Sequence, residues 1–175
     1  MSEKNKVDAI IFDLGISSNQ LFDLKRGFSF KSKGKIDMNM GLASTSAEEI
    51  LNTFDEYNLN LIIGVLGEEK ESSRIAKNII KARDIQKIST VSDLVRIIES
   101  SKKFDYKKKI NICTKTFQAL RIFVNKETTE LIEGIVNATK FVKEGGKIII
   151  ISFHSIEDKI VKFFFKNYSP KKSNP

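Results

Sequence analysis

Cysteine, histidine, proline and tryptophan are scarce in this sequence of 175 residues, which has one cysteine, one histidine, two prolines and no tryptophan. The single cysteine, Cys113, excludes an internal disulfide, and the lack of Cys/His clusters predicts no zinc site or other metal site. No apolar run approaches the roughly 18–20 residues that span a bilayer, and the first residues do not have the pattern of a signal peptide. We therefore expect a reducing, cytoplasmic setting.

Charge, in contrast, is plentiful and unbalanced. Charged residues make up 30% of the chain and the net charge is +8. This charge is compatible with an RNA partner. The basic residues are mostly lysine, however, and a bias in genome base composition explains them equally well. The hydrophobic content of 41% is enough to form the core of one domain, with room for an inserted subdomain.

The most informative segment is a short apolar run, residues 7–12, followed by a loop that begins Asp13-Leu-Gly-Ile-Ser-Ser-Asn-Gln20. The pattern predicts a buried strand that ends in a Gly/Ser loop. In open α/β sheets, ligands bind beyond the carboxyl ends of the strands. The carboxylate of Asp13 can accept hydrogen bonds there, and Gly15 lets the backbone approach a ligand.

A second strand is predicted near the other end of the chain, where residues 147–151 form an apolar, β-branched run. The preceding residues, 128–143, form an amphipathic helix that Gly145-Gly146 should end. Ser155-x-x-Asp158 should cap a final helix. We expect strands 7–13 and 147–153 to be parallel in one sheet, with helix 128–143 packed on it as part of a right-handed crossover.

Between these strands the sequence predicts a long loop, residues 14–44, and then a block of helices. The aromatic residues of the loop (Phe22, Phe28 and Phe30) need somewhere to pack. Helices are expected after the overlapping capping candidates at Thr45 and Ser46, over 59–66, over 68–83, after Thr90, and over 114–125; residues 102–109 read as a basic, solvated loop, and residues 169–175 as a polar tail.

Four segments resemble the signatures of a known family: residues 7–21 (VDAIIFDLGISSNQL), residues 26–30 (RGFSF) with residues 37–40 (DMNM), residues 116–122 (TFQALRI) with Asn125, and residues 145–159 (GGKIIIISFHSIEDK). Together, in this order, they resemble the small-subunit ribosomal RNA methyltransferase H family, the MraW-like enzymes. Such enzymes use S-adenosylmethionine to methylate N4 of a cytosine in the decoding centre of 16S rRNA.

The resemblance implies an α/β fold: a Rossmann-like methyltransferase domain, here residues 1–41 and 113–175, with a helical subdomain inserted at residues 42–112. It also implies that Asp13 and Gln20 contact the cofactor. It assigns no catalytic residue. The implied partners are ribosomal RNA and the small ribosomal subunit, and the implied setting is again the cytoplasm.

The sequence also departs from the family pattern. The family's upstream segment, with its Gly-rich turn and the acidic residue that holds the ribose, has no counterpart here, nor do its closing strands. Asn19 stands where the family tends to have proline, and Asn111-Ile112 stands where it tends to have His-Pro. We therefore expect an incomplete methyltransferase domain that binds the cofactor barely on its own, and that needs an N-terminal partner chain or associates with itself.

Two other functions stay open at this point: a non-catalytic remnant or accessory chain that binds RNA, and an unrelated helical interaction domain. Lys115 and Arg121 lie on a basic helical segment and are candidates for contacts to RNA phosphates, although an ordinary surface helix has the same composition. His154 reads as a structural hydrogen bonder and Cys113 as a packing residue. Ser17 and Ser18 lack the pattern of a serine-hydrolase elbow.

Overall fold

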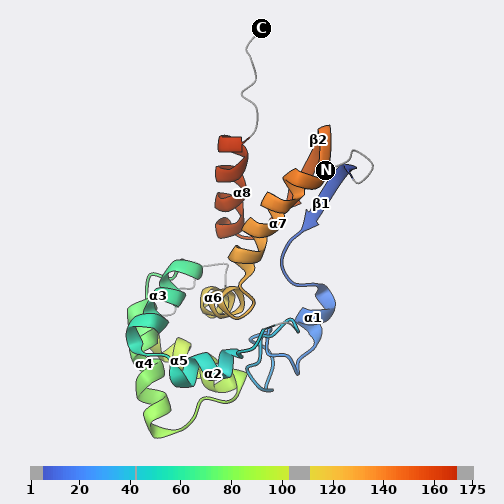
Figure 1. Ribbon diagram of the computed structural model, residues 1–175. Helices are drawn as coiled ribbons and strands as arrows, with labels where there is room; N and C mark the ends of the chain where they lie inside the picture. Colours follow the sequence, from blue (N-terminus) through green and yellow to red (C-terminus); the bar gives the residue numbers. More distant parts are fainter. Residues whose placement is uncertain (1–5, 42, 103–110, 169–175) are drawn as a thin grey trace. The chain divides into compact units, whose positions relative to one another are not determined.

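A computed structural model describes residues 6–41, 43–102 and 111–168 of the chain (Figure 1). The chain divides into two compact units. The first, here called the sheet unit, comprises the residues up to Gly15 and those from Glu127 onward, and the second, the helical unit, comprises Ile16–Lys126. None of the helices in the described ranges is long and apolar enough to cross a membrane.

The sheet unit contains a parallel pair of strands and two helices. Strand β1 is Val7–Asp13, helix α7 is Glu127–Phe141, strand β2 is Val142–Ile151 and helix α8 is Ser155–Tyr168. The two strands pair in parallel, with Ala9 opposite Lys147 and Asp13 opposite Ile151. This confirms the predicted pairing. Helix α7 contacts both β2 and α8 (Figure 1).

Helix α7 packs on the strands through the face that carries its buried residues Leu131, Ile135 and Ala138. The packing is close, because a Cβ added at Gly134 would lie 3.1 Å from Cε1 of Phe12 on β1. The spacing of these buried residues is that of a helix with one apolar face. Residue types in the sequence therefore dictate both the helix and the face that it turns to the sheet.

The predicted end of this helix was wrong. Helix α7 ends at Phe141, and Gly145 and Gly146 lie inside β2. The pairing register shifts between Val7, which faces Val142, and Ala9, which faces Lys147. Gly145 has a φ of +75° in this irregular stretch, so the glycine pair serves a bulge at the start of the strand and not the helix end.

The cap of α8 also differs from the prediction. Ser155 is the first helical residue, so His154 stands at the cap position, where its Nδ1 accepts a hydrogen bond from the Glu157 N–H at 3.4 Å.

The helical unit consists of six helices within the described residues: α1 (Ser18–Phe22), α2 (Ala47–Thr53), α3 (Glu56–Leu66), α4 (Ser72–Ile85), α5 (Val91–Ser101) and α6 (Thr114–Val124). Of the two capping candidates before α2, Ser46 is the one used, and its side chain accepts from the Glu49 N–H. Thr90 forms the predicted capping box with Asp93. The basic stretch expected over 102–109 lies almost entirely outside the described residues, as does the tail over 169–175.

The core of the helical unit is aliphatic and takes in part of the long loop. Fully buried side chains come from α2 to α6 (Ile50, Leu51, Leu59, Ile63, Ile75, Ile79, Leu94, Ile98 and Leu120). The loop adds Phe28, Ile36 and Met38, and the Phe30 ring packs edge-on against Phe117 at 6.2 Å. Phe22 is exposed instead. Because the loop and α6 share this core, the helical unit is larger than the predicted insert 42–112, and that domain assignment stays a prediction.

A buried ion pair joins the segment before α4 to the end of α5. Nζ of Lys102, just beyond α5, lies 2.6 Å from Oε2 of Glu69 and donates to the Ile112 carbonyl at 2.8 Å. Both side chains are nearly buried, at 12% and 5% exposure. Burial by itself raises the pKa of the Glu69 carboxyl, but hydrogen bonds from Lys102 and the Glu71 N–H, with the charges of Lys102 and Lys115, outweigh it and lower the pKa.

Replacing Lys102 with Met should leave the Glu69 carboxylate buried without its partner. We expect the free energy of unfolding at pH 7 to fall by about 3 kcal/mol or more, measured by urea titration of the full chain. Because the folded pKa of Glu69 is depressed, its stabilisation is present above the unfolded pKa and is lost as the pH falls through the folded value. The difference in the free energy of unfolding between wild type and variant should therefore become smaller at acidic pH. Lys77→Met is the matched control, because Lys77 is an exposed lysine on α4 with no side-chain partner among the described residues. A Lys102→Met variant as stable as this control would show that the pair contributes little.

Candidate functional site

The carboxyl ends of the two parallel strands form one edge of the sheet unit. β1 ends at Asp13 and β2 at Ile151, and the next N–H, that of Leu14, still donates to the Ile151 carbonyl at 3.2 Å. Gly15 follows with a φ of +87°, and a Cβ added there would lie 3.6 Å from the Phe153 ring. This left-handed turn favours glycine and leads the chain away from the strand end.

Asp13 is exposed at this edge, and its side chain has no hydrogen bond or ion pair with the part of the chain that the structure describes. Strand-end carboxylates with no internal partner are suited to accept hydrogen bonds from a ligand. The structure thus leaves Asp13 available for the contact that the sequence assigned to it.

Gln20 lies in the helical unit, so the structure gives no distance between it and Asp13. It belongs to a capping box at the start of α1: Ser17 Oγ accepts from the Gln20 N–H at 3.2 Å, and Gln20 Oε1 accepts from the Ser17 N–H at 2.9 Å. The carbonyl oxygen of its amide is therefore engaged. The amide NH2 group remains as the part that can donate to a ligand.

The second signature, residues 26–30 with residues 37–40, lies in a loop whose backbone is strained. Met38 is buried with a φ of +57°, and its N–H donates to the Arg26 carbonyl at 2.8 Å. The Arg26 guanidinium donates to the Asn39 carbonyl at 2.7 Å and lies over the Phe28 ring at 5.4 Å. A Cβ added at Gly27 would lie 2.5 Å from the Lys35 carbonyl oxygen, so only glycine fits at this position. Such strain persists only where the surroundings fix it.

Asn125, at the end of α6, is the residue that holds this loop. Its Oδ1 accepts from the Met40 N–H at 2.8 Å, and its Nδ2 donates to the carbonyls of Met38 at 2.8 Å and Arg121 at 2.9 Å. Asn39 closes the next turn, because its Oδ1 accepts from the Gly41 N–H at 2.6 Å. Two of the resembling segments, far apart in sequence, therefore meet through side-chain amides.

The two predicted RNA contacts are partly engaged within the protein. Lys115 is half-buried, and its Nζ donates to the Glu68 carbonyl at 2.7 Å. Arg121 is also half-buried and is not free of interactions within the protein. The assignment of both residues to RNA stays a prediction. The loop residues Lys25, Lys31, Lys33 and Lys35 are exposed and were not singled out from the sequence.

A buried His–Glu pair follows β2 in the sheet unit. Nε2 of His154 lies 3.2 Å from Oε1 of Glu157, without the geometry of a regular hydrogen bond, and Glu157 Oε2 accepts from the Phe153 N–H at 2.9 Å. The two side chains are 10% and 6% exposed. Burial raises the pKa of the Glu157 carboxyl, but the interactions with His154 and the Phe153 N–H outweigh it and lower the pKa.

Glu127 brings a third potential ligand atom to within 4.8 Å of this pair. The group could not be predicted from the sequence, because Glu127 lies on α7, 27 residues before His154. The hydrogen bond at Nδ1 of His154 argues against a cation on Nε2. A metal on Nε2 requires the imidazole proton on Nδ1, which here accepts from the Glu157 N–H. We therefore assign His154 and Glu157 to the cap of α8, which agrees with the structural role predicted for His154.

Cys113 behaves as the packing residue that the sequence predicts. The thiol is free and buried, and burial, reinforced by the negative charge of Glu99, raises its pKa to about 11. A thiol with this pKa is protonated at neutral pH and is a poor nucleophile.

Comparison with known proteins identifies relatives along the whole chain. The profile of the MraW methylase family matches residues 1–175. The chain is 46% identical over 169 residues to the ribosomal RNA small subunit methyltransferase H of Rickettsia typhi. The aligned segment covers 97% of this chain and 55% of that protein. The protein of the same name from Sinorhizobium medicae is 44% identical over 165 residues, or 94% and 48% of the two chains. The chain spans about half the length of the curated relatives it matches.

Removal of the Asn125 amide should loosen the strained loop. We expect Asn125→Ala to lower the free energy of unfolding by about 1–3 kcal/mol, because two loop hydrogen bonds are lost and the Met40 N–H is left without its acceptor. Hydrogen exchange of the segment 38–41, followed by mass spectrometry, should accelerate. Asn58→Ala, which removes an exposed amide on α3, is the control. Unchanged exchange in the loop of Asn125→Ala would contradict the clamp.

Proposed function

Since the chain belongs to the MraW methylase family, we propose that it forms part of an S-adenosylmethionine-dependent enzyme that methylates N4 of a cytosine in small-subunit ribosomal RNA. The relatives are named for methylation of that RNA, and the family match supports carrying the activity over. We further propose that the enzyme acts in the cytoplasm. The observation that carries the proposal within the molecule is the exposed, unpaired Asp13 at the carboxyl edge of the parallel strands.

Asp13 and Gln20 each carry groups that suit the cofactor. S-adenosylmethionine presents an ammonium group, ribose hydroxyls and an adenine amine, and each of these can donate to the Asp13 carboxylate. Gln20 offers its amide NH2 group as a donor, because its oxygen is used in the capping box. We propose that both residues bind the cofactor, as the resemblance implies.

Little covalent chemistry is asked of the protein in such a reaction. The cofactor, when bound, supplies an already activated methyl group. The protein then has to hold the cytosine amine in line with that group and exclude competing nucleophiles. Cytosine N4 is a weak nucleophile, because its lone pair is delocalised into the ring, and an acceptor for its hydrogens favours attack. The Asp13 carboxylate or the backbone carbonyls of residues 14–17 are the candidates for this acceptor.

The sheet needs more strands than the two described. Ile11, Ile149 and Ile151 are 65%, 45% and 46% exposed on it, and a two-stranded sheet is marginal by itself. We propose that these strands belong to a Rossmann-like sheet. The part of the relatives that this chain does not cover would complete that sheet, in the same polypeptide or in a partner. The helical residues 42–112 would be the subdomain inserted into it. Self-association through the same apolar surface is the alternative.

A second candidate function is RNA binding without catalysis. It is favoured by the net charge of +8 and by the engagement of Gln20 Oε1 within the protein. The two functions differ in what a cofactor titration shows, because an accessory RNA-binding chain has no need of S-adenosylmethionine, even with the rest of the domain present.

Asp13→Asn tests the cofactor assignment. In the chain combined with a polypeptide covering the remaining length of its relatives, we expect the variant to bind S-adenosylmethionine about 10- to 100-fold more weakly by calorimetry. The reason is that a hydrogen bond to a charged group contributes about 1.5–3 kcal/mol.

Asp8→Asn is the matched control, since Asp8 lies on the same strand but pairs with Lys143 at 2.9 Å on the surface. The chain alone should bind the cofactor much more weakly than the combination. Equal affinities of the Asp13→Asn and Asp8→Asn variants would remove Asp13 from the cofactor site.

A further inference from the structure

We propose that one surface of the helical unit, formed by Lys25, Lys31, Lys33 and Lys35, contacts the phosphates of RNA. This surface is here called the lysine loop. The inference rests on the proposed function, since it names the surface through which the enzyme would hold its RNA.

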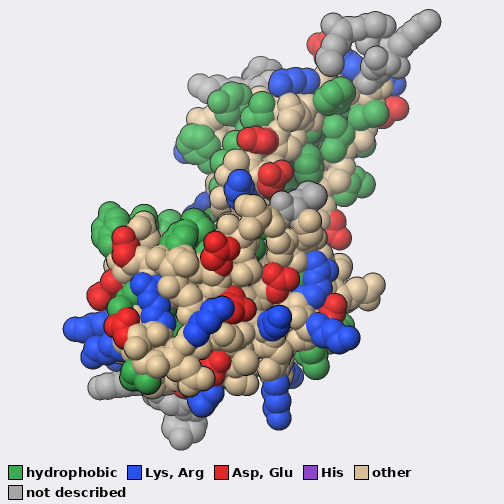
Figure 2. All heavy atoms as spheres, turned by 60° about the horizontal axis from the view of Figure 1, so that its bottom comes forward, with side chains coloured by type: hydrophobic (Ala, Val, Ile, Leu, Met, Phe, Trp, Pro, Cys, Tyr) green, Lys and Arg blue, Asp and Glu red, His purple; other side chains and the backbone are tan. Residues whose placement is uncertain are grey.

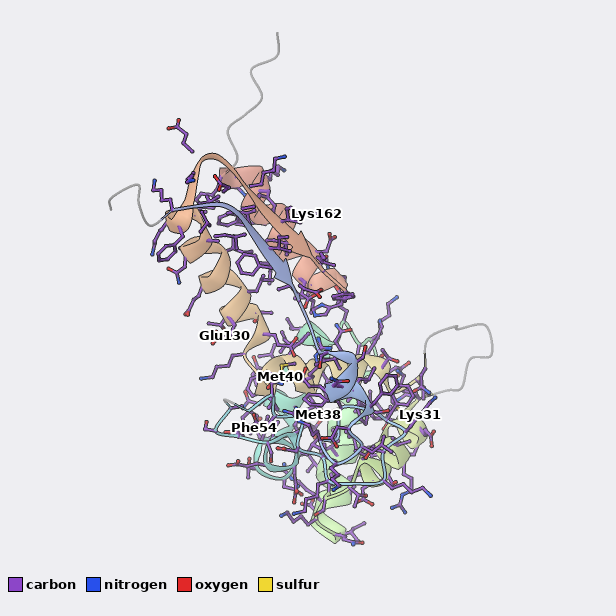
Figure 3. The ribbon with its side chains drawn as sticks, turned by 90° about the vertical axis from the view of Figure 1, so that its right-hand side faces the viewer. Lys31, Met38, Met40, Phe54, Glu130 and Lys162 are labelled. Atoms are coloured by element: carbon purple, nitrogen blue, oxygen red, sulfur yellow. The ribbon has the colours of Figure 1, made fainter. Side chains whose placement is uncertain are left out.

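The side chains of the four lysines are available to bind a partner. All four are exposed, and none has an ion pair or a side-chain hydrogen bond with any residue that the structure describes. Three other lysines of the unit are engaged: Lys87 pairs with Glu48 at 2.8 Å, Lys102 with Glu69, and Lys115 with the Glu68 carbonyl. Figure 3 shows Lys31 at the outer edge of the helical unit. Unpaired ammonium groups of this kind can neutralise phosphates without breaking an internal contact.

Backbone contacts bring the lysines to one place. The Ser32 hydroxyl donates to the Leu24 carbonyl and accepts from the Gly34 N–H at 3.0 Å. A Cβ added at Gly34 would lie 3.8 Å from Cα of Lys25. The turn that carries Lys25 therefore packs against the turn between Lys33 and Lys35, although the two are separated in sequence.

The lysine loop is also rigid, because its backbone is attached to the start of α5. The Gly34 carbonyl accepts from the Val91 N–H at 2.9 Å, the Ile36 N–H donates to the Ser89 carbonyl at 3.4 Å, and Lys35 forms an antiparallel bridge with Thr90. A preformed surface loses less conformational entropy on binding than a mobile loop.

The chemistry of this surface favours phosphates. Lysine is a point charge without the fork of donors that reads a base edge, so the loop is suited to positioning an RNA backbone and not to reading sequence. On the face shown in Figure 2, Lys and Arg side chains are interspersed with Asp and Glu. Acids also lie near the loop, but they are engaged: Asp23 Oδ1 accepts from the Lys25 N–H at 3.1 Å, Glu48 pairs with Lys87 at 2.8 Å, and Asp93 pairs with Arg96 at 2.6 Å. A local cluster, and not the net charge of the chain, is therefore what distinguishes this site.

The test is a salt titration of RNA affinity with charge-matched variants. The probe is a fluorescein-labelled RNA hairpin with a pyrimidine loop, and fluorescence anisotropy gives its affinity for the chain at several salt concentrations. Lys31→Gln with Lys33→Gln, and Lys25→Gln with Lys35→Gln, should each reduce the slope of log affinity against log salt by about 1.4–1.8, because each lost phosphate contact removes about 0.7–0.9. Lys77→Gln with Lys81→Gln, at exposed and unpaired positions of α4, carries the same charge change.

The outcomes separate this inference from the proposed function. Slopes reduced by the loop variants but not by the α4 variant support the lysine loop. Equal reductions in all three variants, or none, overturn it and leave the methyltransferase proposal intact. If polyglutamate displaces the labelled RNA as effectively as unlabelled RNA does, and the loop variants weaken polyglutamate binding too, the surface is assigned to an acidic protein. That result also overturns the inference. No RNA binding by wild type at low salt, even with the remaining length of the relatives supplied, counts against the proposed function itself.

Discussion

The backbone pairing between β1 and β2 is the interaction on which the rest of this structure depends. Parallel strands cannot be joined by a tight turn, so the chain must leave at Asp13 and return to Val142 by a long connection. That connection contains the whole helical unit, Ile16–Lys126, and then α7. Parallel pairing also puts both carboxyl ends at one edge. The position of Asp13 beside the end of β2 is therefore a consequence of topology and not of local sequence.

Within the helical unit, shape is maintained by a few polar side chains set against an aliphatic core. Asn125 satisfies backbone groups of a loop in which Met38 has a positive φ, and the Lys102–Glu69 pair joins the ends of neighbouring helices. These contacts remove freedom from segments that helix and sheet hydrogen bonds do not reach. A loop stiffened in this way can hold exposed charges in fixed positions, which is what recognition of a folded RNA requires.

Much of the architecture could be predicted from the sequence, because it follows from local patterns. The β-branched run at residues 147–151 predicted a strand, and the caps at Ser46 and Thr90 predicted two helix starts. The end of α7 could not be predicted, since a Gly-Gly pair is as suitable for a bulge as for a helix terminus, and only the pairing with β1 decides between them. The contact of Asn125 with Met40 joins residues 85 positions apart, a distance over which sequence periodicity carries no information.

The candidate site also has a part that local sequence patterns predict and a part that only the folded chain shows. Asp13 could be proposed from the sequence because a strand-end acid before glycine is a local pattern, whereas the lysine loop depends on turns that pack together only in the folded chain. The family resemblance supplied the chemistry, which neither composition nor spacing contains.

The most direct test of the account is the product of the reaction. Small ribosomal subunits without the modification would be incubated with labelled S-adenosylmethionine and with this chain, together with a polypeptide covering the rest of its relatives' length, and the rRNA nucleosides would be resolved by mass spectrometry. The account predicts N4-methylcytidine that requires both polypeptides. Label in another nucleoside, or none while the cofactor is bound, would contradict it.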